Sequence, residues 1–220
     1  GEFPIGSSLP AERELAARLG VTRPTLRETL QRLARDGWIT IKQGKPTQVK
    51  DFWWEGNLNV LRAIVRYSTE IPADFVPNLL AVRRALAPAY TRAAIEREPE
   101  TIVAFLSPYP DLQDNAAIFA EADWSLHLAL IRASGNPVYM LIYNGFSGFY
   151  VAMAQRYFEQ VQAQESSRTY YAALLTAAVQ ADPEAASAAS LRAMEESIVL
   201  WRTMDRGGQR GAVAHLGRRE

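Results

Sequence analysis

Two short helical patterns, separated by about three residues, most strongly constrain how this chain can fold. The stretch "LPAERELAARLG" predicts a helix that proline opens in its first turn and that Gly20 ends. Thr22 can cap a second helix, with Pro24 in its first turn, in which leucines recur at helical spacing until Gly37. Two helices joined by so tight a turn are typical of the helix-turn-helix, whose second helix enters the major groove of DNA.

A glycine-tipped hairpin follows the second helix and predicts a wing. The stretch "WITIKQGKPTQVK" reads as two short strands around an exposed tip that carries Lys45 toward a phosphate or into the minor groove. On the second helix, Arg23 and Arg27 lie one turn apart, on the side away from the leucines. Arginine can hold guanine O6 and N7 with two hydrogen bonds, which discriminate by about 1–3 kcal/mol per pair.

The charge distribution supports a division into two modules. The whole chain has 24 Lys and Arg against 24 Asp and Glu, yet residues 1–50 hold nine basic against five acidic residues. The remainder is therefore acidic by four charges. A small basic module joined to a larger acidic one indicates that the first module meets a polyanion and that the second has another task.

The run "LPAERELAARLGVTRPTLRETLQRLARDGWITIKQGKPTQV" resembles the winged-helix domain of the GntR family of bacterial transcription regulators. The chain also resembles the group within that family that regulates fatty-acid metabolism. This wider resemblance extends to about residue 206 and rests on the stretches "DFWW", "SGNPVY" and "RYF". Pro24 and Gln43 depart from the threonine and histidine usual in that group. The resemblance implies a helix before "FPIGSSLP", so we expect the sequence as given to begin inside the domain. It also implies these DNA contacts: Arg13, Arg23, Thr25, Arg27, and at the wing tip Gly44 and Lys45.

The fold class expected is mainly α, with a winged helix-turn-helix at residues 1–50 and an all-α bundle at residues 73–206. We expect a linker at 51–72 and a flexible tail at 207–220. From about residue 57 the chain is rich in alanine and leucine with helical periodicity. Asparagine before Pro137 predicts a helix start, and Asp182-Pro183-Glu184 predicts the start of the last long helix.

GntR-family regulators with such helical domains often bind a metal ion through one aspartate and three histidines. Asp123 and His127 match the first half of that set, four residues apart on one helix. Tyr171 and Met194 stand where the resemblance implies the second and third histidines. Since one imidazole and one carboxylate make a poor transition-metal site, we expect no metal and a buried, hydrogen-bonded His127.

The resemblance implies instead a long-chain acyl-CoA as effector, with no further cofactor. Such a ligand needs an apolar tunnel for its chain and cations for its phosphates. The contacts that the resemblance implies are Arg83, Tyr150, Tyr157, Ser197 and Trp201. Further candidates for the lining are Leu79, Tyr143, Phe146 and Phe149. The candidate cations for the phosphates are Arg83, Arg84, Arg192, Arg202 and Arg206. His127 stands in place of an apolar aromatic residue near the chain, which would change the chain-length preference.

The sequence thus predicts a cytoplasmic homodimer that binds double-stranded, pseudo-palindromic operator DNA. Long-chain acyl-CoA is expected to release this dimer from the DNA. It has no cysteine, no signal peptide pattern and no apolar run of membrane-spanning length, so we expect no membrane partner. One alternative is a related regulator that responds to a small carboxylate, with or without a metal. Another is an enzyme acting on coenzyme A thioesters, but the chain has no nucleophile elbow, and Ser125, Asp123 and His127 diverge along one helix.

Overall fold

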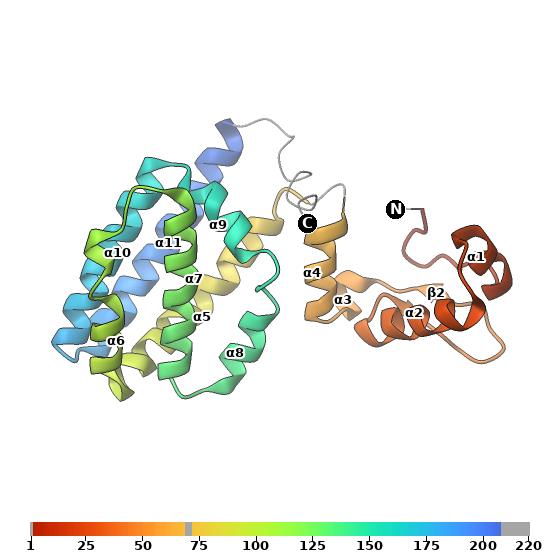
Figure 1. The fold of residues 1–220 in the computed structure, drawn as a ribbon, viewed down its shortest axis with the longest axis horizontal. Helices are drawn as coiled ribbons and strands as arrows, with labels where there is room; N and C mark the ends of the chain where they lie inside the picture. The colour runs from red at the N-terminus through yellow and green to blue at the C-terminus, as the bar shows by residue number, and fades with distance from the viewer. Residues whose placement is uncertain (1, 69–71, 208–220) are drawn as a thin grey trace. The chain divides into compact units, whose positions relative to one another are not determined.

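The computed structural model describes residues 2–68 and 72–207, with side chains through residue 204. The chain divides into two compact units between Ile64 and Val65 (Figure 1). The tail predicted at 207–220 lies, from residue 208 on, outside the described residues. None of the described helices is long and apolar enough to cross a membrane.

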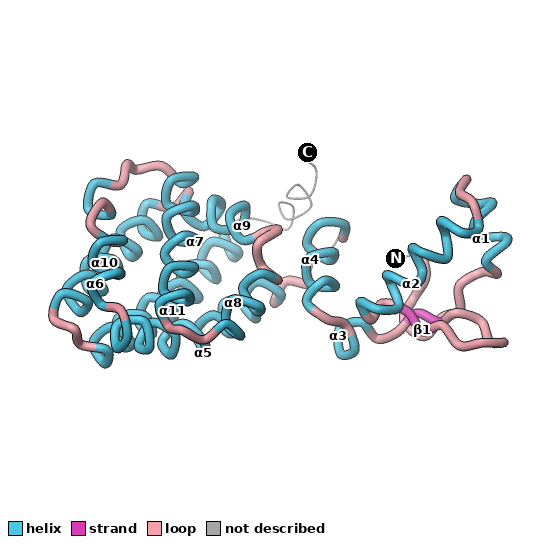
Figure 2. The backbone as a smooth tube through the Cα atoms, turned by 60° about the horizontal axis from the view of Figure 1, so that its bottom comes forward, coloured by secondary structure: helices cyan, strands magenta, loops and turns pink. Residues whose placement is uncertain are grey.

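The first unit is a winged helix-turn-helix. Its elements are α1 (Glu12–Leu19), α2 (Arg23–Asp36), β1 (Ile39–Thr40) and β2 (Gln48–Val49). The strands are antiparallel, with Ile39 opposite Val49, and in the described residues strand structure is confined to this wing (Figure 2). Ser8 adds a bridge to Gln48, a pairing that no local sequence pattern predicts. Leu15, Leu26, Leu30 and Ile39 form the core between helices and wing.

Local capping explains why these helices begin and end where the sequence predicts. The hydroxyl of Thr22 accepts a hydrogen bond from the Thr25 backbone N–H, at 3.3 Å. Gly20 ends α1 and Gly37 ends α2, both in the left-handed conformation, with φ of 66° and 94°. At Gly37 a Cβ atom would lie 2.4 Å from the carbonyl oxygen of Glu55, so only glycine fits where the chain turns into the wing.

The segment predicted as a linker, residues 51–72, carries helical structure. It contains α3 (Phe52–Glu55) and α4 (Leu58–Tyr67), and the division between units falls within α4 rather than at residues 50 and 72. The ring of Phe52 lies 4.7 Å from that of Trp38, and the Asn59 side-chain amide donates to the Asp36 carboxylate at 2.9 Å. These contacts extend the first unit through α3 and the first turns of α4, because they join both helices to the end of α2.

The second unit is an all-α bundle. Its helices are α5 (Phe75–Arg97), α6 (Pro99–Leu106), α7 (Ala116–Ala133), α8 (Pro137–Asn144), α9 (Tyr150–Phe158), α10 (Val161–Val179) and α11 (Pro183–Gly207), with a 3₁₀ turn at Tyr109–Asp111. Helix α11 packs along α5 and α10, and α7 packs on α5 and α9 (Figure 1). Asn136 caps α8 and Pro183 opens α11, as predicted. The predicted fold class is confirmed in both units.

Candidate DNA-binding surface and effector cavity

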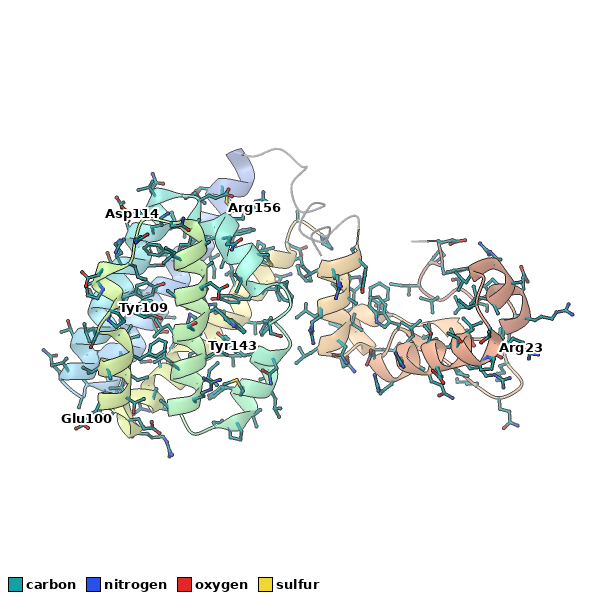
Figure 3. The ribbon with its side chains drawn as sticks, viewed as in Figure 1. Arg23, Glu100, Tyr109, Asp114, Tyr143 and Arg156 are labelled. Atoms are coloured by element: carbon teal, nitrogen blue, oxygen red, sulfur yellow. The ribbon has the colours of Figure 1, made fainter. Side chains whose placement is uncertain are left out.

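The first turns of α2 bring together the exposed side chains predicted to contact DNA. Arg23 projects into solvent, and no described residue forms an ion pair with it (Figure 3). Thr25 is exposed beside it, with its hydroxyl 2.8 Å from that of Thr22. The Nε atom of Arg27 lies 2.8 Å from a carboxylate oxygen of Glu12 on α1. That pair orients Arg27 at the junction of the two helices but leaves its side chain 61% exposed.

Two other predicted DNA contacts lie on α1 and on the wing. Arg13 is exposed on α1, and Lys45 is exposed at the wing tip. Gly44 is in the left-handed conformation with φ of 73°, and the Lys45 backbone N–H donates to the Lys42 carbonyl at 3.1 Å. The turn therefore presents Lys42 as well as Lys45, which makes Lys42 a further candidate phosphate contact beyond those predicted from the sequence.

The second unit contains an apolar cavity between α5, α7, α8, α9 and α11. All five residues predicted to bind the effector line it: Arg83, Tyr150, Tyr157, Ser197 and Trp201. The other lining residues are Val76, Leu79, Leu80, Val82, Leu86, Asp123, Tyr143, Phe146, Phe149, Met153, Ala154 and Phe158. The cavity holds about 80 Å³ of free space. Typical ligand pockets measure roughly 300–1,000 Å³, so a long aliphatic chain requires these side chains to move apart.

A buried ion pair between Arg83 and Asp123 lies in the wall of this cavity, and we call the part of the cavity beside this pair its inner end. An Nη atom of Arg83 lies 2.8 Å from Oδ2 of Asp123, and the two side chains are 15% and 4% exposed. Burial, the largest single cause, raises the pKa of the Asp123 carboxyl, but the charge of Arg83 and the hydrogen bonds from Tyr150 and Arg83 together hold that pKa below its ordinary value. Since Asp123 neutralises its charge there, Arg83 is not placed as a free cation for coenzyme A phosphates.

Two tyrosines donate to the same carboxylate. The Tyr150 hydroxyl donates to Oδ2 of Asp123, and the Tyr171 hydroxyl lies 3.5 Å from Oδ1. Burial raises the pKa of Tyr150 well above its ordinary value, so its hydroxyl keeps the proton that it donates. Asp123 is therefore an ionised carboxylate held by Arg83 and by two hydroxyl groups.

His127 is fully buried and hydrogen-bonded within the bundle, as predicted. Its Nε2 contacts an Nη atom of Arg83, and its Nδ1 lies 2.5 Å from the Tyr90 hydroxyl. Burial, and secondly the charge of Arg83, lower the pKa of His127 to about 3, so the imidazole is neutral at physiological pH. Met194 is also buried, and no group of three or more His, Asp or Glu side chains able to hold a metal forms in the described part of the chain.

The predicted cations differ in their surroundings. Arg84 pairs with Glu195, with Nε 3.0 Å from a carboxylate oxygen, whereas Arg192 and Arg202 are exposed. The side chain of Arg206 lies outside the described residues. A further cation, missed in the sequence, is Arg156 on α9 (Figure 3), whose guanidinium lies 5.9 Å from the ring centre of Trp201, at the cavity wall. Its position one residue before Tyr157 was the available signal.

Comparisons with known proteins agree with both units. Residues 1–49 match the family model of bacterial regulatory proteins of the gntR family, and residues 50–207 match the FadR C-terminal domain. The chain is 45% identical over 172 residues to a fatty acid metabolism regulator protein of Edwardsiella ictaluri, covering 78% of this chain and 72% of the relative. It is 42% identical over 199 residues to that of Proteus mirabilis, covering 90% and 83%.

Solved structures share the fold at low identity. Lar, which controls the expression of the Listeria monocytogenes agr system, aligns with a TM-score of 0.60 at 17% identity, over 93% of this chain and 91% of that one. McbR/YncC of E. coli aligns with a TM-score of 0.52 at 17% identity, over 93% and 92%.

The family model matched by the winged helix-turn-helix and the curated relatives identify this protein as a DNA-binding transcription regulator of the GntR class, not an enzyme. The match to the FadR C-terminal domain and the identity to the curated relatives go further. The chain belongs to the FadR family of fatty acid metabolism regulators.

Proposed function

We propose that this regulator binds a pseudo-palindromic operator as a homodimer and that long-chain fatty acyl-CoA releases it from DNA. The observation that carries the effector half is the convergence of Tyr150, Tyr157, Ser197 and Trp201 on one apolar cavity, although they come from two helices far apart in the sequence. The genes it regulates are, on this proposal, those of fatty-acid degradation and synthesis. A metal or other cofactor has no part in it.

The chemistry of the cavity favours a long aliphatic chain. Its lining is almost entirely apolar, and each methylene group that it removes from water contributes about 0.8 kcal/mol. A sixteen-carbon chain therefore contributes on the order of 10 kcal/mol gross, enough to offset the rearrangement of side chains that a small cavity requires. Half-buried side chains such as Leu79, Phe146 and Met153 are the ones placed to move.

The surroundings of the cavity also favour this ligand over a small carboxylate bound with a metal. The guanidinium of Arg83 lies against both Asp123 and His127, where a metal would have to bind. A small anion at the inner end would face the Asp123 carboxylate. Near Trp201, by contrast, Arg156 is placed to meet a phosphate of coenzyme A.

Thermal unfolding tests the effector class. Saturating palmitoyl-CoA should raise the melting temperature, because a ligand at a hundred times its Kd stabilises the folded state by about 2.7 kcal/mol. Coenzyme A and palmitate at the same concentration should not. Tyr157→Phe should reduce the shift, and Tyr139→Phe, which changes a tyrosine outside the cavity lining, should keep it. Equal shifts with coenzyme A alone would reject the long chain as the recognised feature.

The DNA half is tested on operators selected from a randomised duplex pool by the protein itself. Arg23→Ala should lower affinity for the selected sequence about 10- to 100-fold, because a bidentate guanine contact is worth about 1–3 kcal/mol, and should relax sequence preference. Lys45→Ala should weaken binding to all sequences. It should also reduce the slope of the logarithm of the binding constant against the logarithm of the salt concentration by about one. Arg32→Ala, on a later exposed turn of α2, is the matched control. Unchanged sequence preference in Arg23→Ala would overturn the groove assignment.

A further inference from the structure

The buried contacts of His127 fix the direction of a chain of hydrogen bonds. A guanidinium has only donors, so the Nε2 atom that Arg83 contacts must be the accepting nitrogen of the imidazole. The proton of the neutral ring is therefore on Nδ1. That N–H donates to the hydroxyl oxygen of Tyr90, which lies 2.5 Å away.

The same reasoning continues from Tyr90 to Tyr143. Tyr90 is fully buried, and among the described residues its hydroxyl has two partners, His127 and the Tyr143 hydroxyl at 2.6 Å. Since it accepts from His127, its own proton must go to the oxygen of Tyr143. Arg83 donates to the Tyr143 oxygen as well, since a guanidinium has only donors. The Tyr143 proton therefore has no acceptor among the described residues, although this side chain is 2% exposed and lines the cavity.

A second donor at the same cavity is also unpaired. The Nε atom of Arg83 is buried from solvent and has no hydrogen-bond partner in the described structure, and Arg83 lines the cavity with Tyr143. Leaving a buried donor unsatisfied costs about 1–3 kcal/mol, so a ligand that supplies an acceptor gains where a plain hydrocarbon does not. The nearby Asp123 carboxylate disfavours an anionic acceptor.

We propose that the inner end of the effector cavity binds an uncharged acceptor oxygen of an aliphatic ligand, through the Tyr143 hydroxyl and the Arg83 Nε–H. That oxygen is either the thioester carbonyl or a hydroxyl or keto oxygen on the chain. The inference rests on the proposed function, because it assumes an acyl ligand in this cavity. Tyr143 is then a specificity-determining residue, and His127 is a positioning residue that turns its proton toward the ligand.

Calorimetric titration of the full chain separates the two oxygen sources. Palmitoyl-CoA is compared with S-hexadecyl-CoA, which lacks the carbonyl oxygen, and stearoyl-CoA with a hydroxystearoyl-CoA. In one of these two pairs, we expect the ligand that carries the additional oxygen to bind about tenfold more tightly than the ligand that lacks it. A tenfold difference is about the effect of one good hydrogen bond. Tyr143→Phe should abolish that preference by weakening only the oxygen-bearing ligand. Tyr139→Phe, on the same helix but outside the cavity lining, should retain it.

His127→Phe is a second test variant, because it removes the group that directs the Tyr143 proton and leaves Tyr143 itself in place. Without the imidazole, the Tyr90 oxygen is free to accept from Tyr143, so the oxygen preference should fall while affinity for the unsubstituted chain is kept. Equal affinities within both ligand pairs for the wild type, or a preference that survives Tyr143→Phe, would overturn the inference and leave the proposed function standing. Failure of every CoA derivative to bind the wild-type protein would overturn both.

Discussion

Arg83→Ala is expected to destabilise the effector domain by about 3–5 kcal/mol, because it leaves the Asp123 carboxylate buried without its counter-charge. Asp123 is 4% exposed, and the hydroxyl donors Tyr150 and Tyr171 do not neutralise it. Arg83→Lys keeps a positive charge near Asp123 and should lose less. Denaturant unfolding of the full chain, followed by circular dichroism of the helices, measures the difference.

The neighbouring arginine supplies the control for this prediction. Arg84 pairs with Glu195 at the surface, and exposed pairs contribute about 0–1 kcal/mol, so Arg84→Ala should change stability little. Replacing both members of the buried pair, as Arg83→Met with Asp123→Leu, should recover much of the stability lost by Arg83→Ala. Similar losses for Arg83→Ala and Arg84→Ala would contradict the buried ion pair as the source of the effect.

The winged helix was predictable because its determinants are local in sequence. Thr22 caps the helix that follows it by three residues, and Gly20 and Gly37 stop their helices through their own backbone conformations. The strands of the wing are adjacent, so their tip residues and register follow from one short stretch. The bridge from Ser8 to Gln48 was not predictable in this way, because it joins residues that are forty apart.

The helices within residues 51–72 left a weaker signal that the linker prediction overlooked. Asp51 and Asn57 each precede a short helix, and the Asn57 side chain accepts from the Asn59 backbone N–H, at 2.9 Å. Gly56 between two short helical patterns favoured a break. What makes the segment part of the first unit is tertiary, the packing of Phe52 on Trp38, which no local pattern contains.

In the effector cavity, too, the features that depend on local sequence could be predicted, and those that depend on tertiary packing could not. Helix positions and the burial of His127 could be predicted, but the partner of Arg83 could not, since Asp123 lies forty residues away on another helix. The sequence therefore offers Arg83 as one of the candidate cations for the phosphates, while the structure pairs its charge with Asp123 inside the bundle. Arg156 was overlooked because its relation to Trp201 depends on the packing of α9 against α11.

The largest functional effect is expected in the release of DNA as the acyl chain lengthens. Moving a two-state population from 1:99 to 99:1 requires about 5.5 kcal/mol of differential affinity, roughly half of what a sixteen-carbon chain contributes gross. An eight-carbon chain contributes about half as much and should release little. Titrating acyl-CoAs against a labelled complex with the selected operator should show the half-releasing concentration falling by up to about fifteenfold per two methylenes.

Filling the cavity should shift this dependence without touching the DNA-binding unit. Ala154 lines the cavity on α9, so Ala154→Phe should move the most effective ligand to shorter chains, while Ala152→Phe, on the same helix but outside the lining, should not. Both variants should bind DNA normally without ligand, because a ligand can shift the equilibrium only by its difference in affinity for the two states. Release that does not depend on chain length, or that Ala154→Phe leaves unchanged, would show that the sensor lies elsewhere.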